Sequence, residues 1–151
     1  MKSNIDGVDF FKSKEISDDR GAVLHMIRSD SIGFNSFGEC YFSEIYSGKI
    51  KAWKKHNVQT QNITVPIGEI ILVLYDKRKN SKTFNNKIVC KIGRPENYLR
   101  VKIPPGIWYG FKCISSISSL IVNCTDIPHD KLESETLNFN SNFIPHNWKE
   151  Y

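Results

Sequence analysis

The sequence predicts an all-β protein. Helical periodicity is nearly absent, whereas short stretches with strand character recur along the chain. Glycine and proline residues divide these stretches, as at residues 47–48 and 66–68. Many short strands separated by such turn residues are typical of a β-sandwich or a closed β-barrel.

The expected strands follow one another at short intervals. Polar and apolar residues alternate over 39–46, and the stretch 61–65 ends at Pro66. The stretch 69–75 is continuously apolar after its first residue, Glu69, which is typical of a strand covered on both faces. The expected strands together comprise residues 22–28, 39–46, 61–65, 69–75, 87–92, 98–103 and 119–124.

The C-terminal segment, residues 126–151, is polar and irregular. We expect its aromatic residues Phe139, Phe143 and Trp148 to hold it against the outside of the barrel. The chain contains no internal repeat or low-complexity segment, so we expect one domain over residues 1–151.

The composition is that of a globular protein, with 40% apolar and 25% charged residues. No apolar run approaches the roughly 20 residues of a membrane helix, so no membrane partner is expected. The first seven residues lack an apolar signal core, which favours a cytoplasmic location. Cys40, Cys90, Cys113 and Cys124 form no Cys-x-x-Cys pair, and we expect free thiols in a reducing compartment.

The formal net charge is +5, and its basic residues lie mainly within 49–55, 77–82 and 87–102. The usual motifs for reading nucleic acid are absent, so no nucleic-acid partner is expected. The charge leaves two interpretations open: a solvated basic surface, or attraction for a small anionic ligand such as a diphosphate.

Residues 51–61, Lys-Ala-Trp-Lys-Lys-His-Asn-Val-Gln-Thr-Gln, gather one imidazole with ammonium groups and amides. In a small β-barrel, these residues would lie at the open end. Side chains alternate between the two faces of a strand, so Lys54 and His56 should point to one side and Lys55 to the other.

Three further motifs accompany this segment. They are Asp18-Asp-Arg20-Gly21, Leu74-Tyr-Asp76 and Pro104-Pro-Gly-Ile-Trp-Tyr-Gly-Phe111; Tyr41-Phe-Ser43 precedes the 51–61 segment, and Ile144-Pro-His-Asn-Trp148 lies near the C-terminus. In combination they resemble the dTDP-4-dehydrorhamnose 3,5-epimerase family from about Ile16 to the C-terminus. The resemblance implies a cupin jelly-roll barrel (double-stranded β-helix) that acts on a nucleotide-diphosphate sugar. It further implies a homodimer that exchanges the N-terminal strand and uses no metal or redox cofactor.

The family motifs assign candidate roles to several residues. The arginine of Asp-x-Arg-Gly grips the nucleotide diphosphate in the family, and here it is Arg20; a planar guanidinium suits two phosphates. The usual catalytic histidine falls on Lys54, whereas His56 matches a second histidine found in some members and in the similar sugar 3,4-ketoisomerases. The family's tyrosine acid falls near Val122, and the histidine of the Pro-Pro-Gly segment is Tyr109.

Epimerisation beside a ketone needs a base, stabilisation of an enolate and an acid on the other face. We expect His56 to be the base and Tyr109 to replace the missing acid. Lys54 has three open interpretations: a replacement base, a cation for the enolate or a phosphate, or a solvated lysine at the rim; Lys51 adds positive charge. The other expected pocket residues are Glu44, Gln59, Gln61 and Asn123.

Metal-binding cupins use a His-x-His pair, a glutamate and a histidine after Pro-x-Gly. The matching positions hold Lys54, His56, Thr60 or Gln61, and Tyr109. A single imidazole does not hold a transition metal tightly, so we predict no metal and no other cofactor.

Three functions remain open from the sequence. The first is C3 and/or C5 epimerisation of a nucleotide-linked 4-keto-6-deoxy-hexose for surface polysaccharide synthesis. The second is 3,4-ketoisomerisation of the same substrate class, which one histidine can perform on one face. The third is a non-catalytic cupin that binds a sugar nucleotide.

Overall fold

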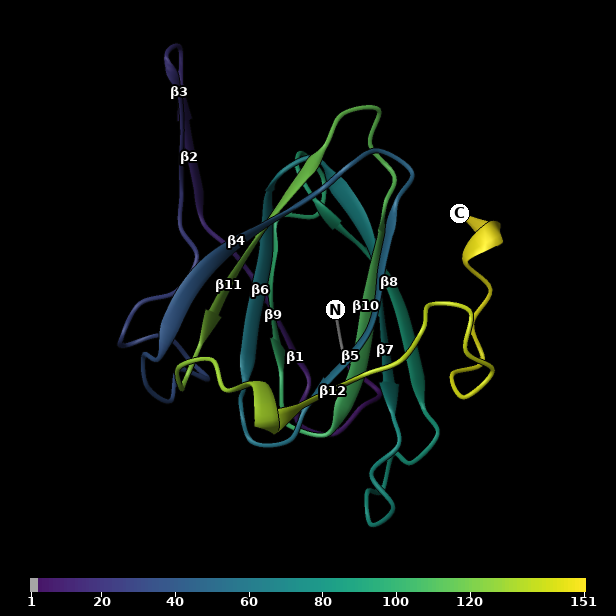
Figure 1. The fold of residues 1–151 in the computed structure, drawn as a ribbon. Helices are drawn as coiled ribbons and strands as arrows, with labels where there is room; N and C mark the ends of the chain where they lie inside the picture. The colour runs from purple at the N-terminus through teal and green to yellow at the C-terminus, as the bar shows by residue number, and fades with distance from the viewer. Residues whose placement is uncertain (1–2) are drawn as a thin grey trace.

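A computed structural model describes residues 3–151 as an antiparallel β-structure built from two facing sheets (Figure 1). The first sheet has the order β1 (Asp9–Lys12), β9 (Leu99–Ile103), β6 (Gln61–Ile67), β11 (Ser119–Thr125) and β4 (Glu39–Ile45). The second has the order β12 (Ser134–Thr136), β5 (Ile50–His56), β10 (Ile107–Cys113), β7 (Glu69–Asp76) and β8 (Lys87–Gly93). The predicted all-β class is therefore confirmed, and the two sheets enclose a jelly-roll barrel of the cupin type.

The strand β7 shows how the sequence builds this barrel. Ile70, Leu72 and Leu74 belong to the core between the sheets, whereas Ile71 and Val73 belong to a second cluster outside the barrel. Both sets are buried, because successive side chains of a strand point to opposite faces. This confirms that the apolar run at 69–75 is a strand covered on both faces.

The C-terminal segment supplies the outer cover. It begins with the 3-10 turn η1 (Lys131–Glu133), adds β12 to the edge of β5, and ends with the turn η2 (Trp148–Glu150). Trp148 and Ile144 are buried against Trp53, and the two indole rings lie 5.0 Å apart. Trp148 anchors the segment as predicted. Phe139 and Phe143 remain about half exposed, and the Phe143 ring lies 6.0 Å from the ring of Trp108.

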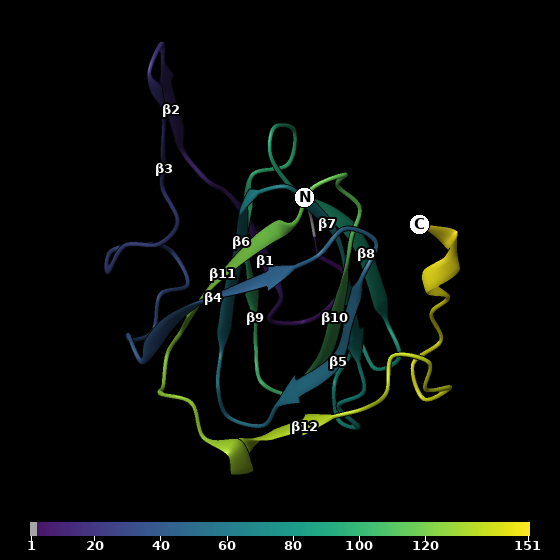
Figure 2. The same ribbon diagram turned by 45° about the horizontal axis from the view of Figure 1, so that its top comes forward.

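A hairpin of β2 (Glu15–Asp18) and β3 (Gly21–Leu24) stands apart from both sheets. Figures 1 and 2 show it projecting from the barrel on the side opposite the C-terminus. Its apolar residues Ile16 and Val23 are 47% and 60% exposed. Within residues 3–151, this is the one strand pair that is hydrogen-bonded to neither five-stranded sheet.

Several elements differ from the expectation. β3 ends at Leu24, so the predicted strand at 22–28 is too long, and β10 was not among the expected strands. Residues 1 and 2, included in the expected domain, lie outside the described residues. Across the described chain, no helix has the length and apolar character needed to cross a membrane.

Candidate active site

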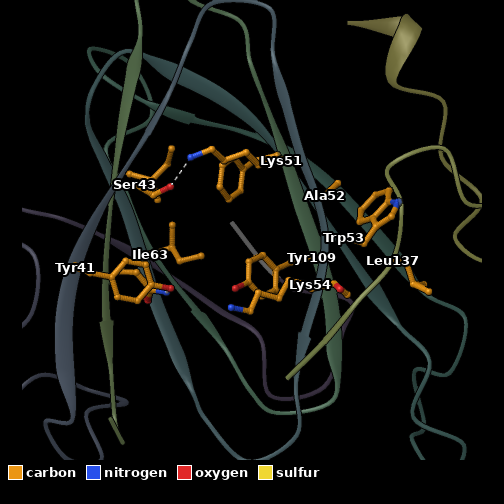
Figure 3. A pocket seen from close by; sticks show the side chains of 13 residues that line it. Tyr41, Ser43, Lys51, Ala52, Trp53, Lys54, Ile63, Tyr109 and Leu137 are labelled. Atoms are coloured by element: carbon orange, nitrogen blue, oxygen red, sulfur yellow. Dashed lines mark hydrogen bonds between the residues drawn. The ribbon is translucent and has the colours of Figure 1, made fainter. Parts of the chain in front are cut away.

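A cavity of about 410 Å³ lies between the two sheets. Figure 3 shows Tyr41 and Ser43 of β4 on one wall and Lys51 and Lys54 of β5 with Tyr109 of β10 on the other. Ile63, Phe111 and Ile121 add apolar surface. An apolar cavity with a few converging polar groups is the usual form of a small-molecule site.

Antiparallel pairing of β5 with β10 positions the second wall. Tyr109 lies directly opposite Lys54, and Trp108 lies opposite Lys55. Residues opposite each other share a face of the sheet, so Tyr109 and Lys54 both face the cavity. Lys55 lies on the outer face, where its ammonium sits 5.4 Å from the Trp108 ring. The predicted opposite orientation of Lys54 and Lys55 is confirmed.

His56 connects the cavity wall to a buried carboxylate. Its Nδ1 contacts Glu133 Oε1, and its Nε2 lies 3.1 Å from the Tyr109 hydroxyl. Glu133 Oε2 accepts hydrogen bonds from the backbone N–H groups of Asn57, Val58 and Gln59. Because a carboxylate accepts from Nδ1–H, Nε2 carries the lone pair and Tyr109 donates to it. The three side chains form a hydrogen-bond chain whose cavity end is Tyr109.

The protonation states agree with this direction of the hydrogen bonds, in which Tyr109 donates to His56 and His56 donates to Glu133. Burial lowers the pKa of His56, an effect that outweighs the opposing influence of Glu133, so the imidazole is neutral near pH 7. Burial acts to raise the pKa of Glu133, but the hydrogen bonds from His56 and the backbone bring its pKa below the ordinary value. Burial strongly raises the pKa of Tyr109, which keeps the phenol protonated. The resting arrangement is carboxylate, neutral imidazole and neutral phenol.

The predicted roles of His56 and Tyr109 need revision in this geometry. His56 is 3% exposed, and Tyr109 rather than His56 lines the cavity. The two residues are bonded to each other on one wall. They are therefore poorly placed to act as base and acid on opposite faces of one sugar.

A second polar chain runs behind the wall formed by β4 and β11. Asn123 donates to the Tyr41 hydroxyl at 2.8 Å and to Gln61 Oε1 at 2.5 Å. Gln61 donates to Gln59 Oε1, and Gln59 donates to the carbonyl of Ile127, each at 2.7 Å. Asn123 lines the cavity as expected, whereas the buried Gln59 and Gln61 support it from behind.

The lysines and Glu44 have different surroundings. Lys51 Nζ reaches Ser43 Oγ at 3.0 Å and the Glu44 carbonyl at 2.5 Å. The Glu44 side chain is exposed on the other face of β4 from Ser43, so it does not line the cavity as expected. Lys54 faces the cavity, and its ammonium has no hydrogen bond or ion pair with any residue in the range 3–151.

Arg20 lies in the turn between β2 and β3 and does not line the cavity of its own chain. Its side chain is 84% exposed and pairs with Asp18 at 2.6 Å. The structure of one chain thus does not bring Arg20 to the other candidate residues. Val122, near which the family's tyrosine is expected to fall, does not line the cavity, although its neighbours Ile121 and Asn123 do.

No cluster of three or more potential metal ligands occurs in the described residues. The polar groups that face the cavity are ammonium, hydroxyl and amide groups. The absence of a bound metal remains a prediction.

Two residues of the site were missed by the sequence analysis. Glu133 lies in the irregular C-terminal segment, 77 residues from His56, and no local pattern marks it. Tyr41 could have been found, because alternation along β4 places Tyr41, Ser43 and Ile45 on one face.

The fold and cavity define a small-molecule-binding protein of the cupin class. The family model for dTDP-4-dehydrorhamnose 3,5-epimerase matches residues 2–151. The chain belongs to this family of isomerases.

Individual relatives agree with this placement. The chain is 33% identical to the spore coat polysaccharide biosynthesis protein SpsL of Bacillus subtilis, over 91% of this chain and 97% of the relative. It is 32% identical to a probable low-salt glycan biosynthesis epimerase of Haloferax volcanii, over 80% of this chain and 78% of that protein. A crystal structure of a dTDP sugar isomerase from Desulfovibrio desulfuricans matches with a TM-score of 0.95 and 42% identity, over 98% and 94% of the two chains.

Proposed function

We propose that this protein epimerises a nucleotide-linked 4-keto-6-deoxy-hexose at C3, C5 or both, in the synthesis of a surface polysaccharide or glycan. The Glu133–His56–Tyr109 chain carries this proposal, because it brings a neutral, oriented imidazole into contact with a cavity hydroxyl. The family and the glycan-related relatives support the substrate class.

The proton moves through Tyr109. As the C–H bond beside the ketone breaks, the Tyr109 oxygen takes that proton and passes its own proton to His56 Nε2. The electron pair of the C–H bond becomes the enolate, and the new imidazolium is stabilised by the Glu133 carboxylate. A positioned proton acceptor of this kind contributes about 10²–10⁴-fold to a rate.

Lys54 provides positive charge for the enolate. It lies opposite Tyr109 in the strand register and faces the cavity without a carboxylate partner in residues 3–151. A fixed cation near developing negative charge lowers the barrier most where water is excluded. The Lys51 ammonium adds charge farther along β5, where a diphosphate could approach.

We further propose a homodimer in which the β2–β3 hairpin reaches the partner. Exposed Ile16 and Val23 on a hairpin whose strands pair with neither five-stranded sheet support this arrangement. β4 is an edge strand, and its outward Phe42 is 67% exposed. In such a dimer Arg20 would meet the diphosphate in the partner's cavity.

A specific observation favours 3,4-ketoisomerisation as a second candidate. His56 and Tyr109 act from one wall, and a ketoisomerase moves a proton between neighbouring carbons on one face. Product NMR in deuterated water separates the candidates. Deuterium at C3 or C5 with the ketone still at C4 supports epimerisation, and a ketone moved to C3 supports isomerisation.

The experiment uses a panel of 4-keto-6-deoxy-hexoses linked to dTDP, UDP or GDP, because the nucleotide is not specified by the cavity residues. Binding is measured separately by calorimetry. Tight binding without deuterium exchange for every substrate would favour the non-catalytic cupin instead.

A further inference from the structure

Tyr41 presents a second hydroxyl to the cavity, from the sheet opposite Tyr109. Tyr41 belongs to β4 in the first sheet, whereas Tyr109 belongs to β10 in the second. Figure 3 shows the two phenols on facing walls of the same cavity. A ligand held between the walls would meet the two hydroxyls from different faces.

Backbone groups at both ends fix the polarity of the amide chain behind Tyr41. The Ile127 carbonyl can only accept, so the Gln59 atom that meets it is the NH₂ group. The Gln59 oxygen then accepts from Gln61, and the Gln61 oxygen accepts from Asn123. At the other end, the backbone N–H of Asn62 can only donate, so the atom it meets is the Asn123 oxygen at 3.2 Å.

This polarity determines what the Tyr41 hydroxyl can do. Asn123 Nδ2 donates one hydrogen to Gln61 and the other to the Tyr41 oxygen. The hydroxyl oxygen therefore acts as an acceptor, and its own hydrogen has no acceptor in the part of the chain that the structure describes. Burial raises the pKa of Tyr41, which keeps this hydrogen in place at neutral pH.

We propose that Tyr41 is the acid that returns a proton to the enolate carbon on the face opposite Tyr109. This inference rests on the proposed epimerase function. The Tyr41 O–H bond breaks, a new C–H bond forms with the electron pair of the enolate, and the ketone is restored with inverted configuration. Bulk water then returns a proton to the Tyr41 phenolate and accepts one from the His56 imidazolium.

The assignment moves the acid to a neighbouring strand. Val122 of β11 has no proton to give, but Tyr41 on the adjacent β4 lies opposite Asn123 in the strand register. Tyr41, on the strand paired with β11, thus takes the place of the missing phenol, and the hydrogen bond from Asn123 orients its hydroxyl. Asn123 is a positioning residue in this scheme.

The test is Tyr41→Phe, compared with Tyr46→Phe as a matched control. Tyr46 lies just after β4 and is 65% exposed, so its hydroxyl is not part of the cavity. Each variant is incubated with the 4-keto sugar nucleotide in deuterated water, and deuterium in recovered substrate is measured separately from deuterium in the epimer. Melting temperatures establish that each variant is folded.

Tyr41→Phe should lower epimer formation by about 10²–10⁴-fold, the contribution of a positioned acid, while deuterium still enters recovered substrate at close to the wild-type rate. Asn123→Asp should give the same pattern, because a carboxylate accepts the Tyr41 hydrogen and withholds it from the ligand. If Tyr41→Phe forms the epimer at the wild-type rate, the assignment is overturned. It is also overturned if the rates of deuterium exchange and of epimer formation fall by the same factor.

A different result would show that the proposed epimerase function itself is wrong. If the wild-type protein binds the substrate and incorporates no deuterium, both the proposed function and the role of Tyr41 are wrong. If the wild type forms epimer and Tyr41→Phe does so equally well, only the role of Tyr41 is wrong.

Discussion

Glu133→Gln is the substitution that most directly perturbs the buried part of the site. The carboxylate accepts from His56 Nδ1 and from three backbone N–H groups. Glutamine has nearly the same shape, but only one oxygen and an NH₂ group that donates. If its oxygen keeps the backbone N–H groups, its NH₂ group faces His56 Nδ1. His56 must then accept at Nδ1 and carry its proton on Nε2.

That change of tautomer removes the lone pair that receives the Tyr109 proton. The expected loss in kcat is about 10²–10⁴-fold, the usual contribution of a positioned base. The KM should change little, because Glu133 does not line the cavity. Replacing charged hydrogen bonds by neutral ones should also cost about 1–3 kcal/mol of stability. In a protein of this size, each kcal/mol corresponds to roughly 2–4 °C in Tm.

The assay follows epimer formation and deuterium incorporation by NMR, with thermal unfolding measured in parallel. Glu135→Gln is the matched control, since Glu135 lies in the same segment but pairs with Lys55 on the outer face at 2.7 Å. The control should keep the wild-type kcat. An unchanged kcat in Glu133→Gln, with the protein folded, would refute the role of the carboxylate in orienting His56.

Three further predictions concern pH, stability and assembly. Burial lowers the pKa of His56 and leaves its neutral form active, so kcat/KM should rise with pH through an apparent pKa below 6.5 and stay level at neutral pH; an acidic limb above 6.5 would contradict this. Trp148→Ala should lower the free energy of unfolding by about 3–5 kcal/mol, because the indole is buried against Trp53; denaturant titration measures this, and a negligible change would show that the C-terminal cover contributes little. Phe42→Asp should convert the proposed dimer into a monomer in sedimentation experiments, and an unchanged dimer would place the interface elsewhere.

The same lowered pKa has a consequence for stability. The unfolded chain binds a proton at His56 below about pH 6.5, whereas the folded chain resists it. Stability from this group is therefore present above that pH and falls as pH drops toward the folded pKa. Glu133, with its lowered pKa, adds a contribution present above its unfolded value near 4.5 and lost as pH falls through the folded value.

Apolar runs and polar–apolar alternation in the sequence predicted most of the individual strands. The apolar run at β7 required two buried faces, and the outer cluster and the barrel core supply them. The strand β10 was missed because it follows directly on the Pro-Pro-Gly turn. Its neighbour β5 mixes lysines with Trp53, and such polar interruption obscures the strand pattern of a pocket wall.

Site residues could be predicted from the sequence only where they lie in a recognisable motif or on the inward face of an expected strand. The pairing of His56 with Glu133 joins residues far apart in the sequence, and no spacing rule indicates it. The choice of Glu44 rather than Tyr41 was an error of alternation, since the inward positions of β4 are the odd-numbered ones. The proposed role of Arg20 requires the cavity of a partner chain, and no pattern in the sequence of one chain shows how two chains would meet.

The most direct test of the proton path through His56 compares wild-type protein with His56→Asn in deuterated water. The proposed epimerase mechanism predicts that the wild type incorporates deuterium at C3 or C5 and keeps the ketone at C4. It predicts that His56→Asn binds the sugar nucleotide with similar affinity in calorimetry but loses exchange, since the amide cannot accept the Tyr109 proton as an imidazole does. Equal exchange by the two proteins would contradict the proton path through His56.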